Sequence, residues 1–265
     1  MSATVESHES VNQLASVWSA IVKDRNSGEI LDMPGINIRW SETRFAFFNT
    51  ITFNEPGATS NTLSQRLAVA ASYMAEQKRA GLIWLFEDLL AQDARQDLES
   101  LIDEAGLTLA LSGYGMAGDV LPMPRPVHSD LTFVRVQTEE QLSAYAEINA
   151  HAYAMPSDDV LHGMSPSTFW SEQAYSFLGL KDGRPVSAAS AIANEGCLFL
   201  ALVATLPSEQ RNGYGEATCR KALHEAWKAT GLTRSVLHAT MAGAPVYERI
   251  GYHKISPIGF YALKA

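Results

Sequence analysis

The stretch that decides the fold is Val203-Ala204-Thr205-Leu206-Pro207-Ser208-Glu209-Gln210-Arg211-Asn212-Gly213-Tyr214-Gly215-Glu216. It joins an apolar strand to the start of a helix. Pro207 ends the strand and opens a turn. Gly213 and Gly215 permit positive φ angles and a close approach of a ligand to the backbone. A helix start also offers unpaired N–H groups and the positive end of the helix dipole. The stretch therefore predicts a loop that binds an anion such as a pyrophosphate.

The segments around this loop predict an α/β domain with a mixed sheet. Cys197–Thr205 is almost wholly apolar, so we expect a central strand that is buried on both faces. Residues 214–229 have the periodicity of an amphipathic helix. We expect further strands and helices on both sides: strands at 131–136, on either side of the turn 181–185, at 235–240 and in the tail 252–263, with helices at 138–153 and 244–250.

Gln210–Gly215 fits the pattern (Gln or Arg)-x-x-Gly-x-(Gly or Ala), and here the chain resembles the GNAT superfamily of acetyltransferases. In that family the pattern binds the pyrophosphate of acetyl-CoA. Leu202-Val203-Ala204-Thr205-x-Pro is similar to the family's fourth strand, and Val246–Tyr252 is similar to its later tyrosine motif. The resemblance covers about residues 130–263 and implies a GNAT-like mixed central sheet flanked by helices.

The resemblance also implies a reaction, in which a neutral primary amine attacks the thioester carbonyl of acetyl-CoA by direct transfer. Tyr247 would protonate the departing thiolate as the catalytic acid. Backbone groups of Val203 and Thr205 would bind the pantetheine arm, and amides from Arg211 to Glu216 would hold the pyrophosphate. The implied cofactor-binding residues are Val203, Thr205, Gln210, Arg211, Asn212, Gly213, Tyr214, Gly215 and Glu216.

Each candidate side chain has a structural alternative. Tyr247 could instead be a packed aromatic with a satisfied hydroxyl. Glu195, in the turn before the central strand, is a candidate general base, although a solvated turn acid is the simpler interpretation. His238 lies on the strand beside the site, and a satisfied core histidine is again the simpler interpretation. We interpret Cys219 as core packing.

The acceptor cannot be named from the sequence, and we expect it to contact residues 150–175. This segment contains Tyr153, His162, Phe169 and Trp170. Such aromatic content suits an apolar or amine-bearing molecule, and it suits a buried helix pair equally well.

The N-terminal half predicts a second, degenerate copy of the same fold, which makes the chain a tandem pair. We expect domains at 1–128 and 129–265, joined by the proline-rich segment 121–126. The first copy lacks the glycine pattern, since Asn54–Ser60 stands in its place, and Ile102 stands where the second copy has Tyr247. The elements expected in this half are strands at 36–40, 45–53, 82–86 and 107–112 and helices at 62–78 and 93–104.

Composition limits the class of protein. Of the 265 residues 46% are hydrophobic, and the net charge is −9. Residues 1–130 carry 9 Lys and Arg against 17 Asp and Glu, whereas residues 131–265 carry 11 against 12. This acidic balance argues against a nucleic acid partner. Because residues 131–265 are nearly neutral, a site for an anionic cofactor is expected in the C-terminal half.

The sequence contains only two cysteines, no apolar run of about 18 residues and no leader with a basic start and an apolar stretch. These features predict a cytoplasmic protein without a membrane partner. We expect no metal site, and a homodimer stays open. The main prediction is an N-acetyltransferase that uses acetyl-CoA on a small-molecule or peptide amine. The alternative is a non-catalytic acyl-CoA-binding or interaction protein. A nucleotide-binding regulator fits poorly, because no Lys-Ser/Thr pair follows the glycines as a P-loop requires.

Overall fold

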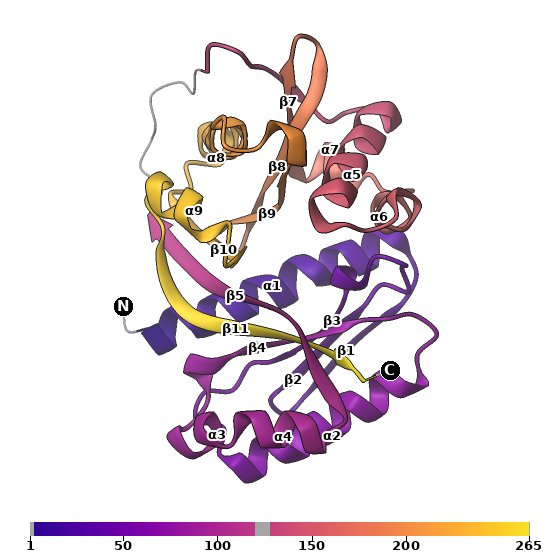
Figure 1. Cartoon of the computed structure of the whole chain (residues 1–265), viewed down its shortest axis with the longest axis vertical. Helices are drawn as coiled ribbons and strands as arrows, with labels where there is room; N and C mark the ends of the chain where they lie inside the picture. The colour runs from indigo at the N-terminus through magenta and orange to yellow at the C-terminus, as the bar shows by residue number, and fades with distance from the viewer. Residues whose placement is uncertain (1–2, 120–127, 265) are drawn as a thin grey trace. The chain divides into compact units, whose positions relative to one another are not determined.

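The computed structural model describes residues 3–119 and 128–264, and within them the chain forms two compact units (Figure 1). Unit 1 is drawn from Met1–Met116, His238–Ala244 and Lys254–Ala265. Unit 2 is drawn from Ala117–Leu237 and Pro245–His253. The compact units thus share the chain differently from a single division at residue 128. The segment 121–126, expected to be a linker, lies outside the described residues.

A mixed sheet forms the centre of unit 1. Its strands in the described residues are β1 (Glu29–Met33), β2 (Ile36–Trp40), β3 (Asn49–Phe53), β4 (Leu82–Phe86), β5 (Leu107–Asp119) and β11 (His253–Leu263). They follow the order β1-β2-β3-β4-β11-β5. β1, β2 and β3 pair antiparallel, β3 and β4 pair parallel, and β11 pairs antiparallel with β4. The last strand of the chain therefore completes the sheet of the N-terminal unit.

Helices cover both faces of this sheet. They are α1 (Ala3–Arg25), α2 (Ser60–Glu76), α3 (Gln92–Gln96) and α4 (Leu98–Glu104), with single 3-10 turns η1 (Ala46–Phe48) and η2 (Glu87–Leu89). The cross-strand row Ile38, Ile51, Ile83 and Tyr261 belongs to one apolar core with Leu63 of α2. Successive strand residues point to opposite faces, so the residues between them face α1.

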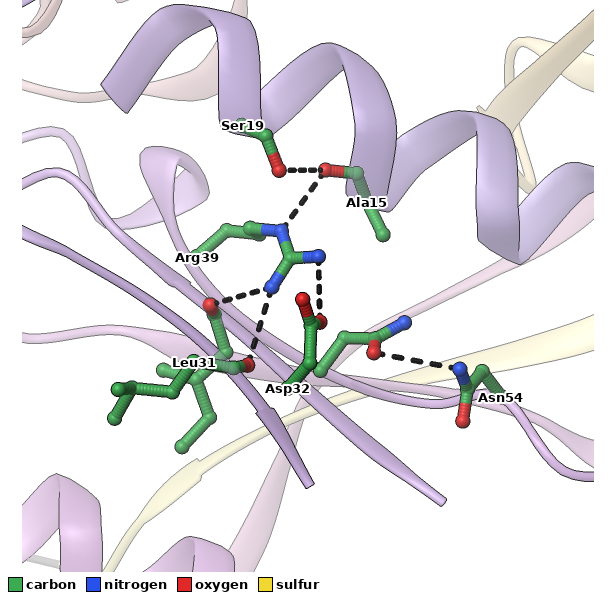
Figure 2. Close-up of polar contacts among 8 residues, drawn as sticks. Ala15, Ser19, Leu31, Asp32, Arg39 and Asn54 are labelled. Atoms are coloured by element: carbon green, nitrogen blue, oxygen red, sulfur yellow. Dashed lines mark hydrogen bonds and ion pairs between the residues drawn. The ribbon is translucent and has the colours of Figure 1, made fainter. Parts of the chain in front are cut away.

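Arg39 of β2 holds α1 against this second face (Figure 2). Its Nε donates to the carbonyl of Ala15 in α1 at 3.0 Å, and Ser19 Oγ donates to the same carbonyl at 2.7 Å. The guanidinium also donates to the carbonyl of Leu31 at 3.1 Å and pairs with the Asp32 carboxylate at 2.7 Å. A buried cation is tolerated only when it is paired in this way.

The strands of unit 2 pair in a mixed pattern as well. Its strands in the described residues are β6 (Thr132–Arg135), β7 (Ala174–Lys181), β8 (Arg184–Asn194), β9 (Cys197–Thr205) and β10 (Arg234–Thr240). The order is β10-β9-β8-β7-β6, with antiparallel pairing from β6 to β9 and parallel pairing between β9 and β10. The predicted strand at 197–205 is confirmed, and its first five residues are buried.

The helices of unit 2 lie on both faces of its sheet. They are α5 (Glu139–Tyr153), α6 (Ser157–Met164), α7 (Phe169–Glu172), α8 (Tyr214–Thr230) and α9 (Ala244–Ile250), with the 3-10 turn η3 (Pro207–Glu209). Thr138 caps α5, because its side chain accepts from the amide of Gln141 while the Gln141 side chain accepts from the amide of Thr138. This capping box confirms the predicted start of the helix to within one residue.

The two halves of the chain share one topology, as the sequence predicts. The order β1-β2-β3-α2-β4, followed by short helices and β5, corresponds to β7-β8-β9-α8-β10, followed by α9 and β11. In each half the third strand pairs antiparallel with the second strand and parallel with the fourth. The helix between these parallel strands is α2 in one half and α8 in the other, so the loop before α2 corresponds to the loop before α8.

Several elements differ from the predictions. The prediction of a strand from residue 45 is wrong for residues 45–48. The 3-10 turn η1 lies there, and Trp18 Nε1 donates to the carbonyl of Phe47 at 2.7 Å. The helix predicted at 93–104 is broken at Asp97, and β5 extends to Asp119. In the described residues α1 and β1 were not predicted, and α6 and α7 lie in the segment 150–175, where a buried helix pair was one of two alternatives. Because α6 and α7 span only one or two turns, their hydrophobic periodicity is too short to detect.

Candidate functional site

A bulge divides β9 into two parts. Leu202 has a φ of +50°, and the pairing of β9 with β8 shifts register between Ala188, opposite Ala204, and Ser190, opposite Ala201. Pairing with β10 runs only from Leu198 to Leu200 of β9. The β10-facing edge from residue 201 to 205, which includes Val203 and Thr205, therefore has no strand partner among the described residues. An extended ligand can pair with such an edge as an added strand does.

The loop after β9 presents free backbone N–H groups. Gln210 Nε2 donates to the carbonyl of Thr205 at 3.4 Å, and Arg211 has a φ of +66°. α8 begins after Gly213, which has a φ of +82° and receives no side-chain cap. The first bond of the helix runs from Ala217 N to the carbonyl of Gly213. In the described part of the chain, the amides of residues 214–216 thus have no partner, which is the arrangement that binds phosphate groups.

The two glycines of this loop are required for different reasons. Gly213 adopts the left-handed conformation that disfavours other residues. Gly215 packs against the strand, since a Cβ atom there would lie 2.8 Å from Thr205 Oγ1. The second glycine of the motif therefore serves the packing of helix on strand as well as access to the amides.

His128 is a neighbour of this loop that the sequence did not single out. Its Nε2 lies 3.1 Å from the carbonyl oxygen of Asn212, and its ring contacts the ring of Tyr214 at 5.2 Å. His128 and Asn212 are 84 residues apart in the chain, so local patterns contain no signal for this contact.

Tyr247 of α9 is 8% exposed and packs against the ring of Tyr252 at 6.2 Å. The hydroxyl of Tyr252 is paired with Ser235 at 2.7 Å, and the hydroxyl of Tyr145 donates to the carbonyl of Leu202 at 2.8 Å. The Tyr247 hydroxyl, by contrast, has no hydrogen-bond partner within residues 3–119 and 128–264. Burial raises the pKa of Tyr247 well above its usual value, so the side chain keeps its proton at neutral pH.

An ionic cluster connects α9 to the start of α8. Glu216 Oε2 accepts from Arg249 Nε at 2.9 Å, and Glu216 Oε1 accepts from Arg220 Nε at 3.0 Å. Arg220 also donates to the carbonyl of Arg249 at 2.8 Å. The helix that carries Tyr247 is thereby fixed to the turn that presents the free amides.

Glu195 lies in the β8–β9 turn, is exposed and has a φ of +44°. Seven residues separate it from Leu202, which is about 20 Å along an extended strand. Tyr145, which is hydrogen-bonded to Leu202, is near enough to Tyr247 to influence its pKa. Glu195 therefore lies at the opposite end of β9 from the bulge.

The simpler interpretations of His238 and Cys219 agree with the structure. His238 belongs to unit 1, its Nε2 lies 2.9 Å from Ser10 Oγ, and its ring packs on Trp84 at 5.3 Å. Burial lowers the pKa of His238 to about 3, so it is neutral. Cys219 is fully buried, and burial raises the pKa of its thiol.

The aromatic residues expected near an acceptor divide into two groups. Phe169 and Trp170 are each 1% exposed and contact each other at 5.0 Å, which favours the buried helix pair. Tyr153 and His162 are half-buried and remain candidates for contact with a substrate.

In unit 1 the chain's own side chains cap the corresponding helix start, that of α2. Thr59 caps α2 by accepting from the amide of Thr62. The amide of Ser60 donates to Asp93 Oδ2 at 2.9 Å, and Ser60 Oγ donates to Asp97 Oδ2 at 2.7 Å. The chain's own carboxylates thus occupy the position where an anion would bind, which agrees with a degenerate first copy.

Residues 3–119 and 128–264 contain neither a cluster of metal ligands nor a membrane-spanning helix. No group of three or more His, Cys, Asp or Glu side chains is placed to hold a metal ion. No helix in this part of the chain combines the length and hydrophobicity that a membrane span needs.

Known proteins share both the sequence pattern and the fold. Residues 138–252 match the model of the acetyltransferase (GNAT) family. No curated protein matches the sequence. A GCN5-related N-acetyltransferase from Kribbella flavida is 20% identical, with a TM-score of 0.67 and 95% of each chain covered. One from Sphaerobacter thermophilus is 14% identical, with a TM-score of 0.60, and the match covers 86% of this chain and 76% of that one.

A third solved structure is a GCN5-related N-acetyltransferase-like protein from Streptococcus suis, which is 16% identical. Its TM-score is 0.56, and the match covers 98% of this chain and 99% of that one. At such identities these structures show a shared fold, while the family match rests on the sequence of residues 138–252. Residues 138–252 of this chain are therefore a domain of the GNAT acetyltransferase family.

Proposed function

We propose that the chain is an N-acetyltransferase that moves an acetyl group from acetyl-CoA to a primary amine by direct transfer. The observation that carries the proposal is the row of unpaired amides at the start of α8, directly after the unpaired edge of β9. The amides of residues 211–216 would bind the pyrophosphate. The backbone of Val203 and Thr205 would pair with the amides of the pantetheine arm.

Acetyl-CoA supplies the acetyl group as an activated thioester. The chain's contribution is to hold the two substrates together and to provide a proton. Tyr247 is suited to the second task, because it is protonated, unpaired and positioned by the Glu216–Arg249 contact. Glu195, the candidate general base, lies at the opposite end of β9 from the bulge, so we propose no role for it in the step.

The acceptor is proposed to be a small-molecule or peptide amine that contacts α5, α6 and the segment up to α7. Tyr153 and His162 are its candidate contacts. We propose a cytoplasmic location, since both cysteines are free and buried, as is usual in a reducing compartment. A homodimer and the absence of nucleic acid or membrane partners stay predictions from the sequence.

The test is calorimetry of the full chain with acetyl-CoA, followed by a screen of acetyl transfer to amino acids, polyamines, aminoglycosides and peptides. We expect one binding site per chain, because Thr59 and Asp93 accept from amides at the start of α2 in unit 1. Two equivalent sites would contradict the degenerate first copy. Tight binding without transfer to any amine would favour the alternative, a non-catalytic acyl-CoA-binding protein.

A further inference from the structure

Leu202 holds a backbone conformation that its side chain disfavours. Its φ of +50° lies in the left-handed region, which large residues other than glycine rarely enter. The surrounding structure must supply contacts that keep such a residue in place. The bulge at Leu202 matters to the proposed function, because it separates the part of β9 that pairs with β10 from the edge at 203–205, which does not pair with β10.

Tyr145 of α5 supplies the contact. It is completely buried, and its Oη donates to the carbonyl of Leu202 at 2.8 Å. The same Oη lies 2.9 Å from Oγ of Ser190, the residue of β8 at which the register shifts. Ser190 Oγ lies in turn 2.7 Å from Ser176 Oγ of β7. One hydroxyl thus connects both strands that form the bulge.

We infer that Tyr145 is a positioning residue, which keeps the bulge of β9 in the shape that presents Val203 and Thr205 to the pantetheine arm. The inference rests on the proposed function. Tyr145 does not touch the cofactor, since its hydroxyl is committed to Leu202 and Ser190. A bulge changes the direction of the strand beyond it, so the loss of its support changes how the edge at 203–205 meets a ligand.

Two variants of the full chain distinguish this role from ordinary core packing. Tyr145→Phe keeps the ring and deletes the hydroxyl, and with it the bonds to the Leu202 carbonyl and to Ser190. Ser190→Ala is the matched control, because it also deletes a buried hydrogen bond of Tyr145 but leaves the bond to Leu202 in place. If Tyr145 only packs, the two variants should behave alike.

Hydrogen exchange of the ligand-free chain and calorimetry with acetyl-CoA are the measurements. We expect Tyr145→Phe to accelerate amide exchange in 201–206 and to weaken acetyl-CoA binding about tenfold, the effect of losing the bond to Leu202 that Ser190→Ala retains. Ser190→Ala should stay within about twofold of the wild type in affinity. Equal exchange and equal affinity in the two variants would overturn the inference.

Leu202→Gly provides a rescue. Glycine adopts a positive φ without support, so Tyr145→Phe combined with Leu202→Gly should fold and recover most of the lost affinity. A double variant that binds no better than Tyr145→Phe alone would contradict the mechanism. Failure of the proposed function is a separate result, in which the wild-type chain itself does not bind acetyl-CoA.

Discussion

Gly213 offers a direct test of the anion site, through a pair of substitutions that differ only in charge. A Cβ atom at this position would meet only His128, at 3.5 Å and 3.9 Å, which is ordinary contact. Asn and Asp enter the left-handed region more readily than other residues with a Cβ. Gly213→Asn and Gly213→Asp should therefore destabilise the fold equally, by about 1 kcal/mol, or about 2–4 °C in Tm.

The effect on binding should differ, because only Gly213→Asp adds a negative charge beside the free amides. Two unit charges about 5 Å apart repel by about 1 kcal/mol in water and by about 3 kcal/mol at an effective dielectric constant of about 20. The Kd of CoA should then be higher for Gly213→Asp than for Gly213→Asn by a factor of about 5 to 150.

Calorimetry with CoA and with dephospho-CoA measures this factor. Dephospho-CoA keeps the pyrophosphate, so its affinity should fall by the same factor as that of CoA. Equal affinity of the two folded variants for CoA would refute the assignment of the pyrophosphate to this turn. A loss confined to CoA would instead place the 3′-phosphate beside residue 213.

Three other variants test the remaining parts of the site and the core. Tyr247→Phe should lower kcat about 100-fold at unchanged CoA affinity if its hydroxyl gives up the proton, and an unchanged kcat where chemistry limits turnover would show that the ring only packs. Arg249→Gln, which releases Glu216 and loosens α9 from α8, should lower kcat about fivefold. Its control is Lys221→Gln, which breaks an ion pair within α8, and a similar loss in both would refute the link. His238 stays neutral when folded, so stability should be full above about pH 6.5 and fall by up to about 1.4 kcal/mol per pH unit towards pH 3. Thermal melts from pH 7 to pH 4 should show this slope in the wild type, and the same slope in His238→Gln would contradict its origin in this group.

Local chemistry explains why the anion loop was predictable from the sequence. Pro207, Gly213 and Gly215 each restrict or free the backbone at their own position, whatever the rest of the fold does. The strand before the loop and the helix after it were found with nearly the bounds that the structure gives. Gly251 likewise predicted the end of α9, and its φ of +120° is a conformation that favours glycine.

Contacts between distant segments were not predictable. His128 meets the loop from 84 residues away, and the bond from Tyr145 to Leu202 spans 57 residues. α1 was not predicted either, and its contacts with the sheet, through Arg39 and the aromatic contacts of Trp18, join distant segments in the same way. The pairing of β11 with β4 depends on which edge is open, and a strand pattern contains no such information.

The two halves of the chain share one topology but serve different purposes. They differ in which groups pair with the amides at the start of the long helix. Each half has a strand, a loop and a long helix before a parallel strand. In unit 1 Thr59 and Asp93 accept from amides at the start of α2, which stabilises the fold without any ligand. In unit 2 the start of α8 has no such cap, so its amides are left for a bound anion. A capped helix contributes to stability in every state of the protein, whereas an uncapped one gains its partners only on binding. The chain therefore keeps one stable copy and one copy whose missing cap is the basis of its proposed activity.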